Sequence, residues 1–407
     1  MIDTVKLWIN CIDLFIMNPK HFIKIIPIVF LVSIISFCAE VKEKPSPHRT
    51  AEELKDSSVT VSFSVVGDIM CHSTQYGYAW VEQDSFDFKP VYREIKSYLA
   101  SADVTMGNLE TVLGGKGLGY SGYPLFNTPD QFLDGLSYAG FDLLFTANNH
   151  VLDQGREGLI RTLNLIEKKN MTYTGANRNK EESESIKIIE KNGVKIAVLA
   201  YTYGTNGIRL KRSQKYLVNI IDTTKIKSDI LEAKKVQPDL VIVYFHFGKE
   251  YERKPSKYQK RIVGFTIQNG ADIILGSHTH TLQPVEMFKT NGGNLDSGFV
   301  AYSMGNFISN QRWRYSDGSA ILNFSISKNT NNGKIKLNDL SFLPFWVFKG
   351  KTGRGKEFVI LPSEIALSDS LPAYVTNKDK KLMKQSYFDT KEIIKRSTDR
   401  LKIRRLH

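Results

Sequence analysis

Short apolar runs, rich in β-branched residues, recur along the chain, and most of them end in a cluster of Gly, Asn, Asp or His. The runs span residues 59–66, 102–106, 141–146, 194–201, 239–245, 272–275 and 299–302. Continuous apolar runs of this length predict strands buried on both faces, as in layered α/β proteins. Helix-like stretches lie between them at 91–99, 158–169, 226–235 and 258–269. The pattern therefore predicts an α/β fold.

The polar clusters after these runs carry the candidate chemistry, because ligands of α/β sheets collect at the carboxyl ends of strands. Taken singly, such a cluster is equally compatible with a turn, a capped helix start or solvated histidines. The combination is more specific, since four of the eight histidines fall at these ends. These four are His150, His246, His278 and His280. The alternating pair His278 and His280 is expected to point one way from an extended segment, and neutral imidazoles suit Zn, Mn or Fe.

Composition narrows the class of protein. With 42% hydrophobic and 24% charged residues, the chain is globular, which excludes a disordered or collagen-like protein. Its 407 residues predict one large or two fused domains. The three cysteines show no metal-knuckle spacing and cannot form a disulfide framework. The net charge of +13 includes +7 from residues 378–407 alone, so it gives no support for nucleic-acid binding by the body.

The N-terminus is predicted to direct export. Met17 opens a second start, and residues 25–37 form an uncharged stretch that fits the apolar region of a signal peptide and is short for a spanning helix. The stretch ends at Cys38, and this resembles a lipoprotein signal in which that cysteine becomes lipid-modified. A plain N-terminal membrane anchor is the alternative. Both readings place the body in the cell envelope, outside the cytoplasmic membrane.

The remaining divisions follow from local composition. Residues 1–38 are the export segment or membrane anchor, and residues 39–58 are a flexible tether. Residues 59–327 form the main domain, residues 328–365 add strands that close it, and residues 366–407 form a basic helical tail. The tail is either an ordinary solvated helix or a face that attracts anionic lipid or an acidic polymer.

Six motifs occur in an order that resembles the CapA-type poly-γ-glutamate capsule synthesis proteins, a branch of the calcineurin-like metallophosphoesterase superfamily. They begin at Gly67, Gly107, Ala147, His246, Gly276 and Tyr302 and read GDIM, GNLE, ANNHVLDQG, HFGKEY, GSHTHTLQP and YSMGNF. The resemblance implies a four-layer α/β/β/α sandwich with a two-metal site. It also implies a membrane-attached protein that acts in assembly or export of an anionic polymer.

The resemblance implies roles for individual residues. Asp68 matches the first metal-binding aspartate, and Asn149, His246, His278 and His280 match later ligands. The usual second histidine is replaced by Met70, and the bridging aspartate by Asn108, with Glu110 as its substitute. One metal position would draw on Asn149, His246, His278 and Glu110, and the other would keep Asp68 and His280. We therefore expect one well-made site for Mn, Zn or Fe and one weak site.

Three functions stay open at this stage. The first is a metal-dependent hydrolase or transferase that acts on a surface polymer or its carrier-linked precursor, with His150 assisting the leaving group and Glu250 as a base. The second is a non-catalytic module that binds the polymer for export at a degraded metal site. The third is a metallophosphodiesterase unrelated to capsule. A membrane-bound polymer synthase is the expected protein partner of the first two.

Two loops are ambiguous in the sequence. The glycine-dense stretch 114–123 lacks a phosphate-binding pattern and is predicted to be a loop beside the pocket. Tyr201, Tyr203 and Arg209 follow a strand, and their positions fit either a pocket lining or an ordinary loop.

Overall fold

The computed structural model describes residues 57–83, 85–368 and 371–404 of the chain. The predicted export segment 1–38, with Cys38, and most of the tether 39–58 lie outside the described residues. Within the described residues, no helix combines the length and the apolar character that crossing a membrane requires.

The larger of the two main sheets contains the strand that follows the tether. Its members are β1 (Ser58–Ile69), β4 (Val104–Leu109), β5 (Leu143–Phe145), β6 (Thr172–Thr174), β13 (Asn306–Ile308), β14 (Gly318–Asn329), β15 (Ile335–Thr352), β16 (Gly355–Pro362) and β17 (Lys402–Ile403). The order is β16-β15-β14-β1-β4-β5-β6, with β13 paired to β1 and β17 to β15. Strands β1, β4, β5 and β6 are parallel, whereas β14, β15 and β16 continue the sheet as antiparallel hairpins.

The smaller main sheet is also parallel at its centre. It contains β7 (Lys187–Lys191), β8 (Val194–Thr202), β9 (Leu240–His246), β10 (Ile273–Ser277), β11 (Val285–Lys289) and β12 (Ser297–Ala301). The order is β11-β12-β10-β9-β8-β7, with antiparallel strands at the two edges. Strands β2 (Trp80–Glu82) and β3 (Ser85–Phe86) form a separate two-stranded ribbon.

The two main sheets pack against each other through a continuous apolar core. Alternate residues of β1, such as Val61, Phe63 and Val65, belong to this core together with residues of β8, β9 and β10. Across the interface, the rings of Phe145 and Tyr244 stack with centroids 4.1 Å apart. The strands are buried on both faces, as their apolar runs predict.

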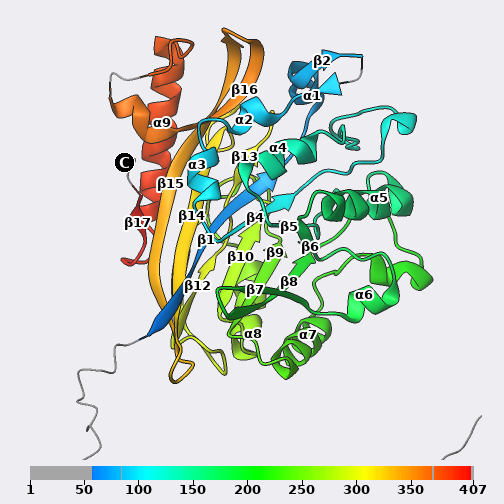
Figure 1. The fold of residues 1–407 in the computed structure, drawn as a ribbon, viewed down its shortest axis with the longest axis vertical. Helices are drawn as coiled ribbons and strands as arrows, with labels where there is room; N and C mark the ends of the chain where they lie inside the picture. The colour runs from blue at the N-terminus through cyan, green and yellow to red at the C-terminus, as the bar shows by residue number, and fades with distance from the viewer. Residues whose placement is uncertain (1–56, 84, 369–370, 405–407) are drawn as a thin grey trace, which may run out of the picture. The chain divides into compact units, whose positions relative to one another are not determined.

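Helices cover the outer faces of both sheets (Figure 1). On the larger sheet lie α1 (Ser73–Ala79), α2 (Lys89–Tyr92), α3 (Lys96–Ala100), α4 (Phe132–Ala139) and α5 (Gly155–Lys168), and on the smaller sheet lie α7 (Thr223–Lys235) and α8 (Lys257–Gln268). A short helix, α6 (Lys180–Glu184), precedes β7. The α/β/β/α sandwich expected from the resemblance is therefore confirmed. The stretch 91–99, predicted as one helix, instead forms α2 and α3 with a turn between them.

The C-terminal hairpins reach beyond the smaller sheet and carry a helix of their own. Met383 of α9 (Asn377–Lys395) packs with Trp346 and Phe348 of β15. Trp346 lies on the same face of β15 as Phe342, which belongs to the core between the sheets. Helix α9 thus covers the part of the inner face that the smaller sheet leaves open. One face of the basic tail is consequently buried, while its lysines stay at the surface.

A close backbone approach holds the end of β1 in place. Asp68 N donates to Gly305 O at 2.9 Å, and a Cβ atom at Gly67 would lie 1.7 Å from the same oxygen. Only glycine fits at this position, because no backbone carbonyl can move aside there without breaking the strand pairing.

We expect Gly67→Ala to destabilise the protein by about 3 kcal/mol, at the upper end of the cost of overpacking. Thermal unfolding measures this change. Gly77→Ala is the matched control, because a Cβ at Gly77 in α1 meets nothing within 4 Å and alanine favours the helix. Equal melting temperatures for the two variants would contradict the assignment of Gly67 to a steric role.

Candidate metal centre

The strand ends place the predicted residues side by side. Asp68 at the end of β1 lies opposite Asn108 of β4 in the parallel register, and His246 at the end of β9 lies opposite Ser277 of β10. Both pairs sit at carboxyl ends, so the two sheets deliver their polar residues to the same edge of the sandwich. Glu110 follows β4 directly, and its backbone N donates to Ile69 O at 3.0 Å.

Two groups of side chains at this edge have the spacing of a metal site. Glu110, His246 and His278 form the first, and Asp68, Glu110 and His280 form the second. Within each group the candidate ligand atoms all lie within 4.8 Å of one another, and all five residues are buried. Glu110 belongs to both groups. The residues therefore offer two adjacent positions that share one carboxylate.

Two buried atoms in this cluster support a cation as the missing partner. Glu110 Oε1 and His278 Nδ1 have no hydrogen-bond partner among the described residues. A buried polar atom without a partner costs about 1–3 kcal/mol, so such atoms in a native protein require an explanation. Carboxylate oxygen and imidazole nitrogen are both donors for Mn, Zn and Fe. The residues present thus fit a divalent metal.

The two carboxylates of the cluster differ in charge. Burial raises the pKa of the Asp68 carboxyl, but a hydrogen bond and charge from His280, together with the charge of His246, outweigh it and lower this pKa below its usual range. Burial also raises the pKa of Glu110, and here nearby Asp68 raises it further. Glu110 consequently holds a proton until a positive charge replaces it.

The histidines are held in the form that binds metals. Burial lowers the pKa of His246 well below its usual range, and neighbouring His278 lowers it further. Burial and the charge of His280 lower the pKa of His278 to about 3. Both imidazoles are therefore neutral at pH 7, which is the ligating form.

The segment with His278 and His280 differs from the expectation. It is bent, with φ of +92° at His278 and +58° at His280, whereas the sequence pattern predicts an extended strand. Left-handed backbone at non-glycine residues costs on the order of 1–3 kcal/mol and is concentrated at functional sites. The bend sends the two imidazoles into different donor groups.

Asparagines surround the donor groups. Asn108 Nδ2 donates to Asp68 Oδ1 at 2.8 Å, so this amide orients a candidate ligand. Asn149 Oδ1 lies 2.6 Å from His246 Nε2, which places Asn149 beside the first donor group, as the resemblance implies. Asn148 Nδ2 donates to Leu109 O at 2.7 Å and thereby fixes the turn after β4.

His150 lies beside the donor groups and belongs to neither. Its Nδ1 donates to Asp153 Oδ2 at 2.8 Å, and Asp153 Oδ2 also accepts a bond from Phe126 N at 2.8 Å. The ring of Phe126 meets the imidazole nearly edge-on, at 4.7 Å between centroids. This pairing fixes the orientation of His150 and leaves Nε2 as the nitrogen able to exchange a proton with a bound molecule.

Two other predicted positions lie at the margin. Met70 is buried, and its thioether is a poor ligand for a hard dication. Glu250 is exposed. Burial raises the pKa of Glu110 and of Tyr251, and the charge of Glu250 raises both further.

Four residues of the site have no signal in the sequence analysis, or only a weak one. The ring of Tyr203 lies against that of His278, with centroids 4.5 Å apart and planes tilted by 41°, and the ring centroids of Tyr251 and His280 are 5.8 Å apart. Asn206 accepts a hydrogen bond from Asn149 Nδ2 at 3.0 Å, and its own amide lies 3.4 Å from the His150 ring. Asp153 could have been found from its i+3 spacing to His150, whereas Asn206 comes from a loop distant in the sequence.

Four layers with buried histidines and carboxylates at the strand ends define an α/β/β/α sandwich protein with a candidate metal centre. The chain belongs to the family described as bacterial capsule synthesis protein PGA_cap, whose sequence profile matches residues 62–311.

Relatives in the same family cover most of the chain. It is 29% identical over 323 residues to the capsule biosynthesis protein CapA of Bacillus anthracis, covering 77% of this chain and 74% of that protein. It is 30% identical over 314 residues to the PGA biosynthesis protein CapA of Bacillus subtilis (strain 168), covering 76% of this chain and 78% of that protein.

Solved structures of similar arrangement are more distant. The NAD nucleotidase NadN of Haemophilus influenzae aligns with a TM-score of 0.45 at 14% identity, over 85% of this chain and 57% of that chain. The calcineurin-like phosphoesterase YfkN of Bacillus subtilis aligns with a TM-score of 0.43 at 14% identity, over 83% of this chain and 100% of that chain. This chain spans less than two thirds of the nucleotidase.

Proposed function

We propose that this protein is a metal-dependent hydrolase or transferase that acts in the synthesis or export of an anionic surface polymer of the poly-γ-glutamate type. Membership of the capsule synthesis family and the names of its relatives support the pathway. The substrate in this proposal is the polymer or its carrier-linked precursor, and a membrane-bound synthase is the expected partner.

The proposal that this protein is an enzyme rests on one observation. The carboxylate of Glu110, which belongs to both donor groups, has no hydrogen-bond partner for Oε1 among the described residues. It lies in a cluster flanked by the oriented His150–Asp153 pair. A purely binding site has no need of a fourth histidine that is held by a carboxylate and lies outside the donor groups. Together these features match an enzyme that combines a metal with a proton donor.

When bound, a divalent metal at this site supplies Lewis acidity toward a phosphoryl or carbonyl oxygen and favours deprotonation of water. Asp68, Glu110, His246, His278 and His280 would hold it. His150 is positioned to give a proton from Nε2 to the departing group, while Asp153 keeps the proton on Nδ1. The exposed Glu250 is the candidate base at the mouth of the site.

The proposal includes a location in the cell envelope. Its support is the apolar stretch 25–37 followed by Cys38 in the sequence, which lies outside the described residues. Lipid attachment at Cys38 or a membrane anchor formed by residues 1–38 would keep the domain at the outer side of the membrane.

The test combines metal content with turnover on one preparation. We expect stoichiometric Mn, Zn or Fe by elemental analysis, and hydrolysis of either a chromogenic phosphodiester or γ-linked glutamate oligomers. Metal without turnover on either substrate would overturn the enzyme proposal in favour of a polymer-binding module, which the loss of a ligand at Met70 also favours. Turnover of the phosphodiester alone, with no binding of glutamate oligomers, would favour a phosphodiesterase unrelated to capsule.

A further inference from the structure

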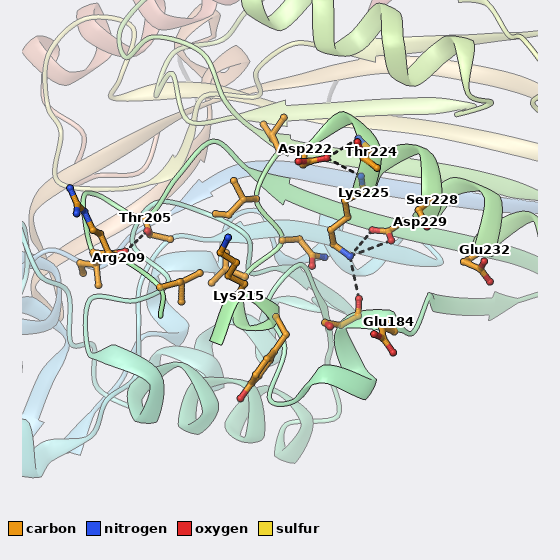
Figure 2. Close-up of a pocket in the computed structure, with 18 of the residues that line it drawn as sticks. Glu184, Thr205, Arg209, Lys215, Asp222, Thr224, Lys225, Ser228, Asp229 and Glu232 are labelled. Atoms are coloured by element: carbon orange, nitrogen blue, oxygen red, sulfur yellow. Dashed lines mark hydrogen bonds and ion pairs between the residues drawn. The ribbon is translucent and has the colours of Figure 1, made fainter. Parts of the chain in front are cut away.

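A large open cavity lies between the segment after β8 and helix α7 (Figure 2). Its volume is about 1460 Å³, larger than the ~300–1,000 Å³ typical of pockets for small molecules. Ile208, Leu210 and Val218 provide apolar lining, while Thr205 and Asn219 provide polar groups. The space therefore suits an extended chain with both methylene and polar groups.

One tight turn connects the cavity to the metal centre. Thr205 and Gly207 line the cavity, and Asn206 between them contacts both Asn149 and His150. Asn206 and Gly207 have φ of +47° and +79°, so the backbone reverses direction here and presents neighbouring residues to the two sites. A chain lying in the cavity would thus have one end at the turn that touches the catalytic histidine.

Each acidic residue of the cavity already has a partner within the protein. Asp222 caps α7 by accepting from the backbone N of Thr224 and Lys225. Asp229 accepts from the Tyr201 hydroxyl and pairs with Lys225 at 3.0 Å. The other two acids also have cationic partners, Glu232 with Lys235 and Glu184 with Lys180.

Two cations of the cavity remain without such partners. Arg209 and Lys215 are exposed, and within the described residues neither has an ion pair or a hydrogen bond through its side chain. In Figure 2 the Lys215 amine lies between Thr205 and Lys225, with no interaction drawn to it. Lys211 and Arg212 add two further cations to the same loop. Arg209 and Lys215 are thus cations without a partner among the described residues, and this favours an anionic ligand beside them.

We infer that this cavity binds a segment of the anionic polymer on which the metal centre acts, with polymer carboxylates held by Arg209 and Lys215. This inference rests on the proposed function for the identity of the ligand. Arg209 pairs with a carboxylate through its planar guanidinium, and Lys215 acts as a point charge. The apolar wall around Ile208 and Leu210 contacts the methylene groups between successive carboxylates. Arg209 and Lys215 are thus specificity-determining residues that touch the substrate away from the reacting bond.

The test measures binding of fluorescently labelled γ-linked glutamate oligomers to the full-length protein by anisotropy, at low and high salt. The variant Arg209→Glu/Lys215→Glu is expected to bind about tenfold or more weakly, since it loses two cationic contacts to polymer carboxylates and adds two repelling charges. Lys227→Glu/Lys257→Glu changes the net charge equally at exposed positions outside the cavity, and we expect less than about a twofold effect after screening by salt. Unchanged melting temperatures establish that both variants are folded.

The outcomes separate this inference from the proposed function. Binding that depends on Arg209 and Lys215 without any turnover would support the polymer site and overturn the enzyme proposal. Turnover that is equally fast in the reversed-charge variant and its control would overturn the polymer site alone. Displacement by inorganic polyphosphate, with no binding of glutamate oligomers, would also overturn it, because the cavity would then select phosphate.

Discussion

Glu110→Gln is expected to remove metal from both positions of the centre and to reduce turnover by more than about a hundredfold. Residues that merely orient metal ligands already contribute 10–100-fold, and Glu110 is a candidate ligand in both donor groups. Glutamine preserves the shape of the side chain and removes its ability to become an anion. The buried cluster would then keep only the Asp68 carboxylate to balance a dication.

Metal content by elemental analysis and turnover on the same samples test this expectation. His278→Ala and His280→Ala each disturb only one donor group, so each should lose less metal than Glu110→Gln. Glu252→Gln is the matched control, because this exposed glutamate lies outside the donor groups and pairs with Lys249. If Glu110→Gln kept the metal content of the unmodified protein, the shared-carboxylate arrangement would be wrong.

His150→Gln is expected to lower turnover by about 10²–10⁴-fold, the usual contribution of a general acid, while metal content stays unchanged. Turnover should fall without loss of metal because His150 lies outside the donor groups and pairs with Asp153. Loss of proton donation matters most when the leaving group is a poor one. The defect should therefore be smaller for a nitrophenyl ester than for an alkyl ester of the same phosphate.

Asp153→Asn provides a second measurement at the same site. It leaves the imidazole in place but removes the carboxylate that keeps the proton on Nδ1, so we expect a smaller loss and a displaced pH profile of turnover. Equal defects on both esters in His150→Gln, or loss of metal in that variant, would instead assign His150 to binding.

The sequence alone predicts the layers of the fold and the main members of the site. Buried parallel strands are continuous apolar runs, and polar residues after such runs lie at one edge of the sheet, so Asp68, His246 and His278 could be placed together. The packing of the C-terminal helix is not predictable in the same way, because the apolar stripe through which α9 packs on β15 also fits a solvated helix. Its partner strands become evident only in three dimensions.

The rest of the site depends on contacts between distant segments. Nothing in the sequence indicates that Asn206 reaches His150, because that contact is made by a loop 56 residues away. The bend at His278 and His280 is equally hidden, since alternating residues normally predict an extended strand. The role of Glu110, which is inferred from residue type, is a prediction that the experiments above test.

The length of strand β1 also determines the distance between the metal centre and the start of the folded domain. Ser58, the last residue of the predicted tether, and Asp68 in the metal centre lie near opposite ends of this one strand. At about 3.3 Å per residue, they are separated by about 33 Å. If the protein is held at a bilayer through its N-terminus, the metal centre lies at the end of β1 that is farther from the attachment point. Such a reach favours a long polymer that protrudes into water over a bond buried among lipid headgroups.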